Sequence, residues 1–117
     1  MGMPWRVYYH VTCNMASNRL DTLKSMLEQD PGSAFARYGL AMEYVNLGRF
    51  DEAMDEFHSL IGSNPDYSAG YYHAGRTLER MGKTDEARTM YEKGIEATTR
   101  NGDAHTRSEL QAALDML

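Results

Sequence analysis

Apolar side chains recur at spacings of three and four along most of the chain, which is the pattern of amphipathic helices. Glycine, proline and aspartate interrupt this pattern at regular intervals, where helices end or begin. The pattern predicts six helices, near residues 17–29, 34–47, 51–63, 68–81, 85–99 and 104–117. Ser17 is the expected cap of the first helix, and Thr106 with Glu109 has the form of a capping box for the last.

The two central pairs of helices repeat each other at an offset of 34 residues. Gly48-Arg49-Phe50-Asp51-Glu52-Ala53 aligns with Gly82-Lys83-Thr84-Asp85-Glu86-Ala87, and Pro31 aligns with Pro65. The predicted buried stripes are Leu40, Ala41, Tyr44 and Leu47, then Ala53, Phe57, Leu60 and Ile61, then Tyr71, Ala74, Gly75, Leu78 and Met81, then Ala87, Met90, Tyr91, Gly94 and Ile95. Small residues recur at matching places, Ala41 with Gly75 and Ala53 with Ala87, which indicates close crossings of helices.

A 34-residue helix-turn-helix unit with these markers resembles the tetratricopeptide repeat (TPR). The resemblance covers residues 34–67 and 68–101, and the flanking helices look like caps. The departures from the family pattern are Arg37, Leu60, Leu78 and Thr99. Thr99 replaces the closing proline and predicts a longer second helix. The resemblance implies an all-α, right-handed superhelix of about two full repeats, as in short stand-alone bacterial TPR proteins.

The resemblance also implies that the first helix of each pair lines a concave face, which binds a peptide or helix of another protein. Side chains on those helices that are not used in packing are the candidate contacts: Phe35, Tyr38, Met42, Tyr72, His73, Arg76, Glu79 and Arg80. Arg76 and Arg80 could hold a carboxylate of the partner. An alternative is that Phe35, Tyr38 and Met42 pack on the first helix instead. Tyr38 and Met42 also stand where chaperone-binding relatives need polar groups for a terminal carboxylate, which argues against that activity.

Composition narrows the function further. With 12 basic and 17 acidic residues, the net charge is -5, which disfavours nucleic acid and anionic membranes as partners. No run approaches the roughly 18 apolar residues that a membrane span needs. The single cysteine, Cys13, cannot form an internal disulfide or a cysteine zinc site, which favours a reduced, cytoplasmic location.

Residues 1–14 stand apart from the helical pattern. Their apolar run is broken by Arg6 and His10, and no partner strand is visible elsewhere. One interpretation is that they lie outside the domain of residues 15–117, as a disordered arm or a non-native leader. The alternative is an arm that docks through Trp5, Tyr8 and Tyr9.

The sequence offers no catalytic, metal or cofactor site. The four histidines form no i,i+4 pair, no glycine-rich phosphate loop is present, and no serine lies in a nucleophile motif. The acidic pairs at 51–52 and 85–86 repeat at 34 residues and suit the first turn of a helix. We therefore expect a non-enzymatic adaptor that binds another protein in the groove. The alternative is a self-assembling scaffold, a homo-oligomer formed through a cap helix, the groove or the N-terminal arm.

Overall fold

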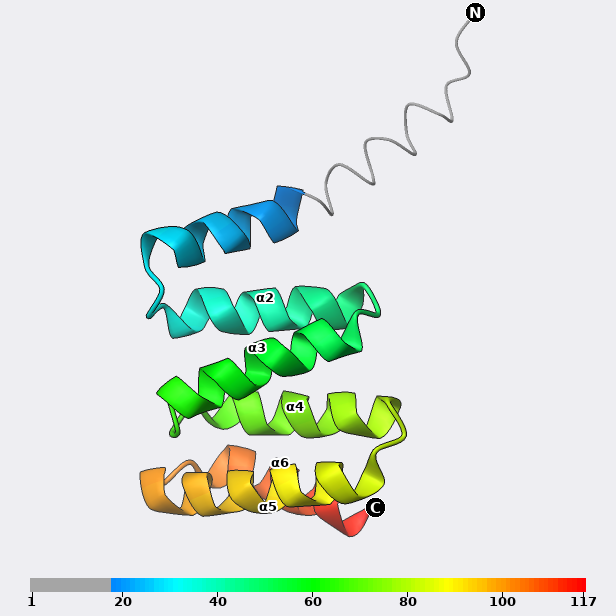
Figure 1. Ribbon diagram of the computed structural model, residues 1–117. Coiled ribbons are helices and arrows are strands. Elements are labelled where there is room, and N and C mark those ends of the chain that lie inside the picture. The colour runs from blue at the N-terminus through cyan, green and yellow to red at the C-terminus, as the bar shows by residue number, and fades with distance from the viewer. Residues whose placement is uncertain (1–17) are drawn as a thin grey trace, which may run out of the picture.

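A computed structural model describes residues 18–117, and every regular element in this range is a helix. A helix over residues 18–29 is followed by α2 (Ala34–Asn46), α3 (Phe50–Ser63), α4 (Ser68–Arg80), α5 (Thr84–Asn101) and α6 (Ala104–Asp115). Consecutive helices run antiparallel and stack along one direction (Figure 1). The predicted all-α fold of six helices is confirmed for the described part of the chain. Ser17 and the proposed arm of residues 1–14 lie outside it.

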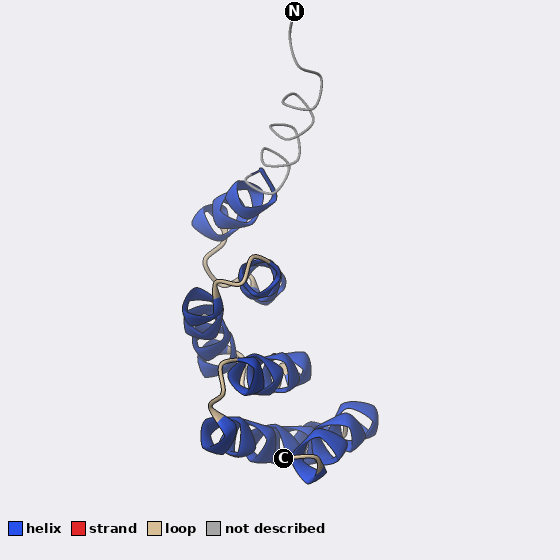
Figure 2. Ribbon diagram, turned by 90° about the vertical axis from the view of Figure 1, so that its right-hand side faces the viewer, coloured by secondary structure: helices blue, strands red, loops and turns tan. Residues whose placement is uncertain are grey.

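The helices form two layers. Figure 2 shows α3 and α5 in one layer and α2, α4 and α6 in the other. From α2 onward each helix contacts the next, and α6 also reaches back to α4. The layer of α2, α4 and α6 therefore presents one continuous face, made of the first helix of each pair and the terminal helix.

The 34-residue repeat is visible in the backbone. Both α2 and α4 have 13 residues, and their bounds differ by 34 positions. Gly48 and Gly82 follow these helices with φ of 74° and 78°, a conformation that glycine adopts without a steric penalty. The amide of the next residue closes the turn in each repeat, from Arg49 to the Tyr44 carbonyl (2.8 Å) and from Lys83 to the Leu78 carbonyl (2.9 Å).

Several helix ends differ from the expected ones. α2 and α4 stop one residue early, and α3 and α5 begin one residue early. α5 runs on to Asn101, which agrees with the longer helix expected from Thr99. The predicted capping box at Thr106 is wrong. Asp103 is the N-cap of α6, and its carboxylate accepts a hydrogen bond from the Thr106 amide at 3.1 Å. An aspartate next to Gly102, which has φ of 78°, can reach the first free amides of α6, whereas Thr106 already lies inside the helix.

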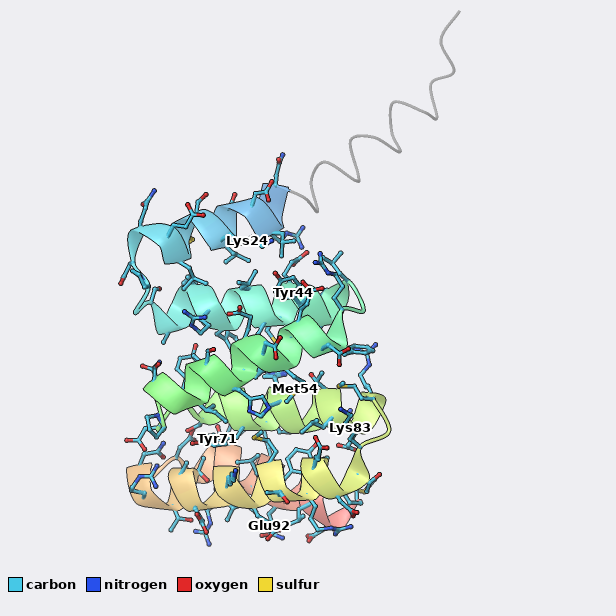
Figure 3. All side chains as sticks on the ribbon, viewed as in Figure 1. Lys24, Tyr44, Met54, Tyr71, Lys83 and Glu92 are labelled. Atoms are coloured by element: carbon cyan, nitrogen blue, oxygen red, sulfur yellow. The ribbon has the colours of Figure 1, made fainter. Side chains whose placement is uncertain are left out.

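The core lies between the two layers and follows the predicted stripes closely. Met54 and Tyr71 lie inside the stack, and Glu92 points from α5 into solvent (Figure 3). The fully or nearly buried side chains are Leu20, Ala36, Leu40, Ala41, Tyr44, Ala53, Met54, Phe57, Leu60, Tyr71, Ala74, Leu78, Ala87, Met90, Tyr91, Ala97, Leu110 and Ala113. Leu47 was wrongly placed in the stripe: it caps α2 beyond its last turn and is 41% exposed.

α4 and α5 cross at very close range. A Cβ on Gly75 would lie 2.2 Å from Cε1 of Tyr91, whose ring is fully buried. Nothing larger than glycine fits there without moving the ring. This confirms the predicted close crossing and fixes how deeply α5 sits against α4.

The first helix of each repeat also holds the loop that precedes it. The Tyr71 hydroxyl donates to the carbonyl of Pro65 at 2.7 Å. At the matching position Arg37 donates to the carbonyl of Pro31 at 3.4 Å, and it forms an ion pair with Glu56 at 2.8 Å. Arg37 in the first repeat thus bonds to the carbonyl that corresponds to the one Tyr71 reaches in the second repeat.

Candidate peptide-binding groove

Two hollows lie on the face formed by α2, α4 and α6, and we call them together the groove. The first has a volume of about 280 Å³ and the second about 380 Å³. Met42, Val45, Tyr72, His73, Arg76, Thr77 and Arg80 line the first hollow. Tyr72, Arg76, Glu79, Glu109, Ala112, Ala113 and Met116 line the second. Tyr72 and Arg76 belong to both hollows, so the two are parts of one path that crosses α4.

An aromatic cluster stands beside the first hollow. The Tyr38 ring lies 5.5 Å from the Tyr67 ring and 5.8 Å from the His73 ring, measured between centroids. His73 in turn meets Tyr72 edge-on at 5.3 Å. These separations are typical of favourable aromatic pairs. The cluster joins α2, the loop before α4, and α4 itself, and so gives this side of the groove a preformed apolar wall.

Burial controls the protonation of the cluster. It lowers the pKa of His73, and the nearby Arg76 lowers it further, while Glu109 on α6 opposes the shift. Burial also raises the pKa of Tyr38, with a smaller contribution from Tyr67. Burial therefore favours the uncharged forms of His73 and Tyr38, which suit apolar or aromatic contacts.

The groove carries two cations. Arg76 is exposed at the point where the hollows meet, and within residues 18–117 it forms no ion pair. Arg80 lies one helical turn further on, with its guanidinium 4.8 Å from the centre of the Phe50 ring. That cation–π contact orients the Arg80 guanidinium.

Each carboxylate of the groove lies close to a polar side chain other than Arg76. Glu79 accepts a short hydrogen bond from the Tyr91 hydroxyl, and burial together with this bond raises the pKa of Tyr91. Glu109 lies 2.7 Å from Nε2 of His105 on the same helix. Among residues 18–117, by contrast, neither Arg76 nor Arg80 forms an ion pair, so both guanidinium groups are available to a carboxylate of a ligand.

The structure brings most of the sequence-predicted contacts together. Seven of the eight line the groove or its aromatic wall, and only Phe35 does not. Phe35 is 73% exposed on the first turn of α2, so it does not pack on the helix of residues 18–29. Tyr38 packs on Tyr67 and His73, beside the first hollow.

Sequence reasoning missed the contribution of α6 and of the loop before α4. Ala112, Ala113 and Met116 line the second hollow because α6 folds back beside α4. Nothing in the repeat pattern gives the direction of a terminal helix. Tyr67 joins the aromatic cluster from the residue before α4, and no periodicity marks that position.

A third hollow, of about 310 Å³, opens on the other layer. Its lining is His58, Leu78, Asp85, Glu86, Thr89, Met90 and Lys93.

Among residues 18–117, no three His, Cys, Asp or Glu side chains come together as metal ligands would. No helix in this range is long and apolar enough to cross a membrane.

Comparison with known proteins identifies the repeat. The tetratricopeptide repeat pattern matches residues 20–74 and 48–114. A TPR repeat-containing protein of Pseudomonas aeruginosa is 26% identical over 98 residues, covering 84% of this chain and 93% of the relative. A TPR and J domain-containing co-chaperone of Cryptococcus neoformans is 29% identical over 85 residues, which are 72% of this chain but only 16% of that protein.

A solved structure agrees with the sequence relatives. The solution structure of a TPR domain protein from Salinibacter ruber is 39% identical and superimposes with a TM-score of 0.69, covering 73% of this chain and 86% of the other. Members of this family are in general non-catalytic modules through which proteins bind one another. The repeat length, the two-layer helical stack and these relatives agree: the chain belongs to the tetratricopeptide repeat family and is a protein-interaction module.

Proposed function

We propose that this protein is an adaptor that binds a peptide or a helix of another protein in the groove between α2, α4 and α6. The observation that carries the proposal is the continuity of the two hollows through Tyr72 and Arg76. An apolar path with a few polar groups along it is the usual form of a peptide site. The co-chaperone relative named above is a precedent for a TPR chain that works on other proteins.

The aromatic residues are the expected anchors. Tyrosine supplies a large contact area at low conformational cost, and methionine adapts to different ligand shapes. Tyr38, Met42 and Tyr72 are half-buried, so each still offers surface to a ligand. His73 and Arg76 add polar contacts, whereas Glu79 serves mainly to hold the Tyr91 hydroxyl.

The test is capture of partners from a lysate of the source organism on the immobilised full chain. We expect proteins bound by the native chain to be lost from the Tyr38→Ala/Tyr72→Ala variant. A Lys24→Ala/Glu92→Ala variant, changed at two exposed positions away from the groove, is the matched control. Circular dichroism checks that all three are folded. Equal capture by the native chain and the tyrosine variant would refute groove binding.

Self-assembly is the alternative that the sequence left open. Sedimentation of the full chain at high concentration separates it from the adaptor. A strict monomer agrees with the adaptor, while a dimer that the tyrosine variant abolishes would mean that the groove holds a second copy of this chain.

A further inference from the structure

We infer that the groove selects a peptide segment in which one acidic side chain stands between two large apolar side chains. The inference rests on the proposed function and adds the chemistry of the ligand. It depends on where one cation lies relative to two apolar hollows.

The position of Arg76 sets the order of the ligand's side chains. Arg76 lines both hollows and therefore lies between them. Met42 and Val45 supply apolar surface on one side of it, and Ala112, Ala113 and Met116 supply it on the other. A segment that follows this path places an apolar side chain in each hollow and passes the guanidinium in the middle.

Charge complementarity gives the middle residue. Arg76 has no ion-pair partner within residues 18–117, although its neighbours include two glutamates. Glu79 accepts from the Tyr91 hydroxyl, and Glu109 lies 2.7 Å from Nε2 of His105, so neither glutamate forms an ion pair with Arg76. Arg80 adds a second positive charge on the same face of α4. A carboxylate of the ligand would accept charge-assisted hydrogen bonds from Arg76, whose planar guanidinium donors suit a carboxylate.

The geometry favours a side-chain carboxylate over a chain-terminal one. A terminal carboxylate would place the end of the ligand at Arg76 and leave one hollow empty. Because apolar surface continues on both sides of Arg76, a ligand that runs through it fills more of the groove. The inferred ligand is therefore an internal segment of its protein, with the order apolar, acidic, apolar.

Selection of random linear peptides on the full chain tests this inference. We expect the enriched peptides to share an Asp or Glu with large apolar residues on both sides. On an Arg76→Glu variant, we expect enrichment to move to Lys or Arg at the same place. The Lys24→Ala variant, changed outside the groove, is expected to select the same peptides as the native chain.

Binding of one enriched peptide, made synthetically with both ends blocked, gives the magnitude. We expect the acid-to-amide change in the peptide to weaken binding to the native chain about tenfold, the scale of one charge-assisted contact. The same change should have no effect on binding to Arg76→Ala. A full effect on Arg76→Ala would overturn the assignment of this residue.

The outcomes separate the inference from the proposed function. If the binding of the enriched peptides depends on Tyr72 but the peptides share no acidic residue, the inference is overturned and groove binding is kept. Peptides whose binding is unchanged by Tyr72→Ala, or no enrichment at all on a folded chain, overturn both.

Discussion

The two repeats of this chain build the same helix crossing from different side chains. In the first repeat, Ala41 on α2 and Phe57 on α3 are both fully buried, and Val45 lies one turn after Ala41. In the second repeat, the residues at these three positions are Gly75, Tyr91 and Glu79. The Tyr91 hydroxyl, which Phe57 lacks, donates a hydrogen bond to Glu79. The Tyr91 ring lies against the backbone at Gly75, where there is no side chain.

The three differences form one unit. Tyr91, which corresponds to Phe57 of the first repeat, has a hydroxyl that needs a hydrogen-bond acceptor. Glu79, which corresponds to Val45, supplies that acceptor. The ring then lies so close to α4 that alanine in place of Gly75 does not fit. The comparison teaches that a repeat position cannot be interpreted alone, because a small residue, an aromatic residue and a groove residue change together.

The largest effect is expected for Gly75→Ala. The new methyl group would overlap the Tyr91 ring, so we expect a loss of about 2–3 kcal/mol in the free energy of unfolding, typical of overpacking a core. Chemical denaturation measures it. The matched change Ala41→Gly should cost only about 1 kcal/mol, the difference in helix propensity.

A triple variant sharpens this test. Gly75→Ala combined with Tyr91→Phe and Glu79→Val gives the second repeat the residues of the first. We expect it to recover most of the stability lost by Gly75→Ala alone. A triple variant as unstable as the single one would show that the three positions do not form one unit.

The next effect is that of Tyr91→Phe. Removing the hydroxyl ends the hydrogen bond to Glu79 and should lower the free energy of unfolding by about 1–2 kcal/mol. In a Glu79→Val background, the same change should cost less, because no acceptor is left. A double-mutant cycle by chemical denaturation measures this coupling. Additive losses would contradict it.

A smaller effect concerns pH. His73 stands where the first repeat has Gly39, and its pKa is lowered in the folded chain. The unfolded chain therefore takes up a proton at this site more readily, so His73 supports the fold above pH of about 6.5 and loses that support as pH falls through the folded-state pKa. We expect the denaturation midpoint to fall less between pH 7.5 and 5.5 in His73→Gln than in the native chain. An equal fall in both would show that His73 does not contribute.

The smallest effect is expected at the end of α5. Arg100 reaches back to Asp66 with an N–O distance of 2.8 Å, a link that the shorter α3 does not make. Both side chains are more than half exposed, and such pairs stabilise a fold little because water screens them. Asp66→Ala should leave the denaturation midpoint within experimental scatter. A clear drop would mean that the longer helix depends on this contact.

The sequence predicted the layers of this fold well because repetition carries most of the information. Each buried stripe occurs twice, so an error in one copy is corrected by the other. The exceptions, Leu47 and Thr106, lie at helix ends. At a helix end, one or two hydrogen bonds decide which residue is the cap and which residue is exposed, and the apolar periodicity does not predict them.

The candidate site was predicted less completely, for a physical reason. Tyr38, Met42 and Tyr72 follow from the unburied face of the first helix in each pair. The roles of Glu79 and Met116 depend instead on contacts between helices, one through the Tyr91 hydroxyl and one through the path of α6. Such contacts are set by tertiary packing, which the spacing of residues does not encode.

The hydrogen bonds to Pro31 and Pro65 have a consequence for how such a chain could grow. In each repeat, the donor at Arg37 or Tyr71 and its proline acceptor are six residues apart. A segment cut just before the proline keeps both groups, along with the Arg37–Glu56 pair of the first repeat. Residues 31–64 thus keep these polar links within one unit. A gene duplication with these boundaries would lengthen the stack by one repeat and extend the binding face by one more helix.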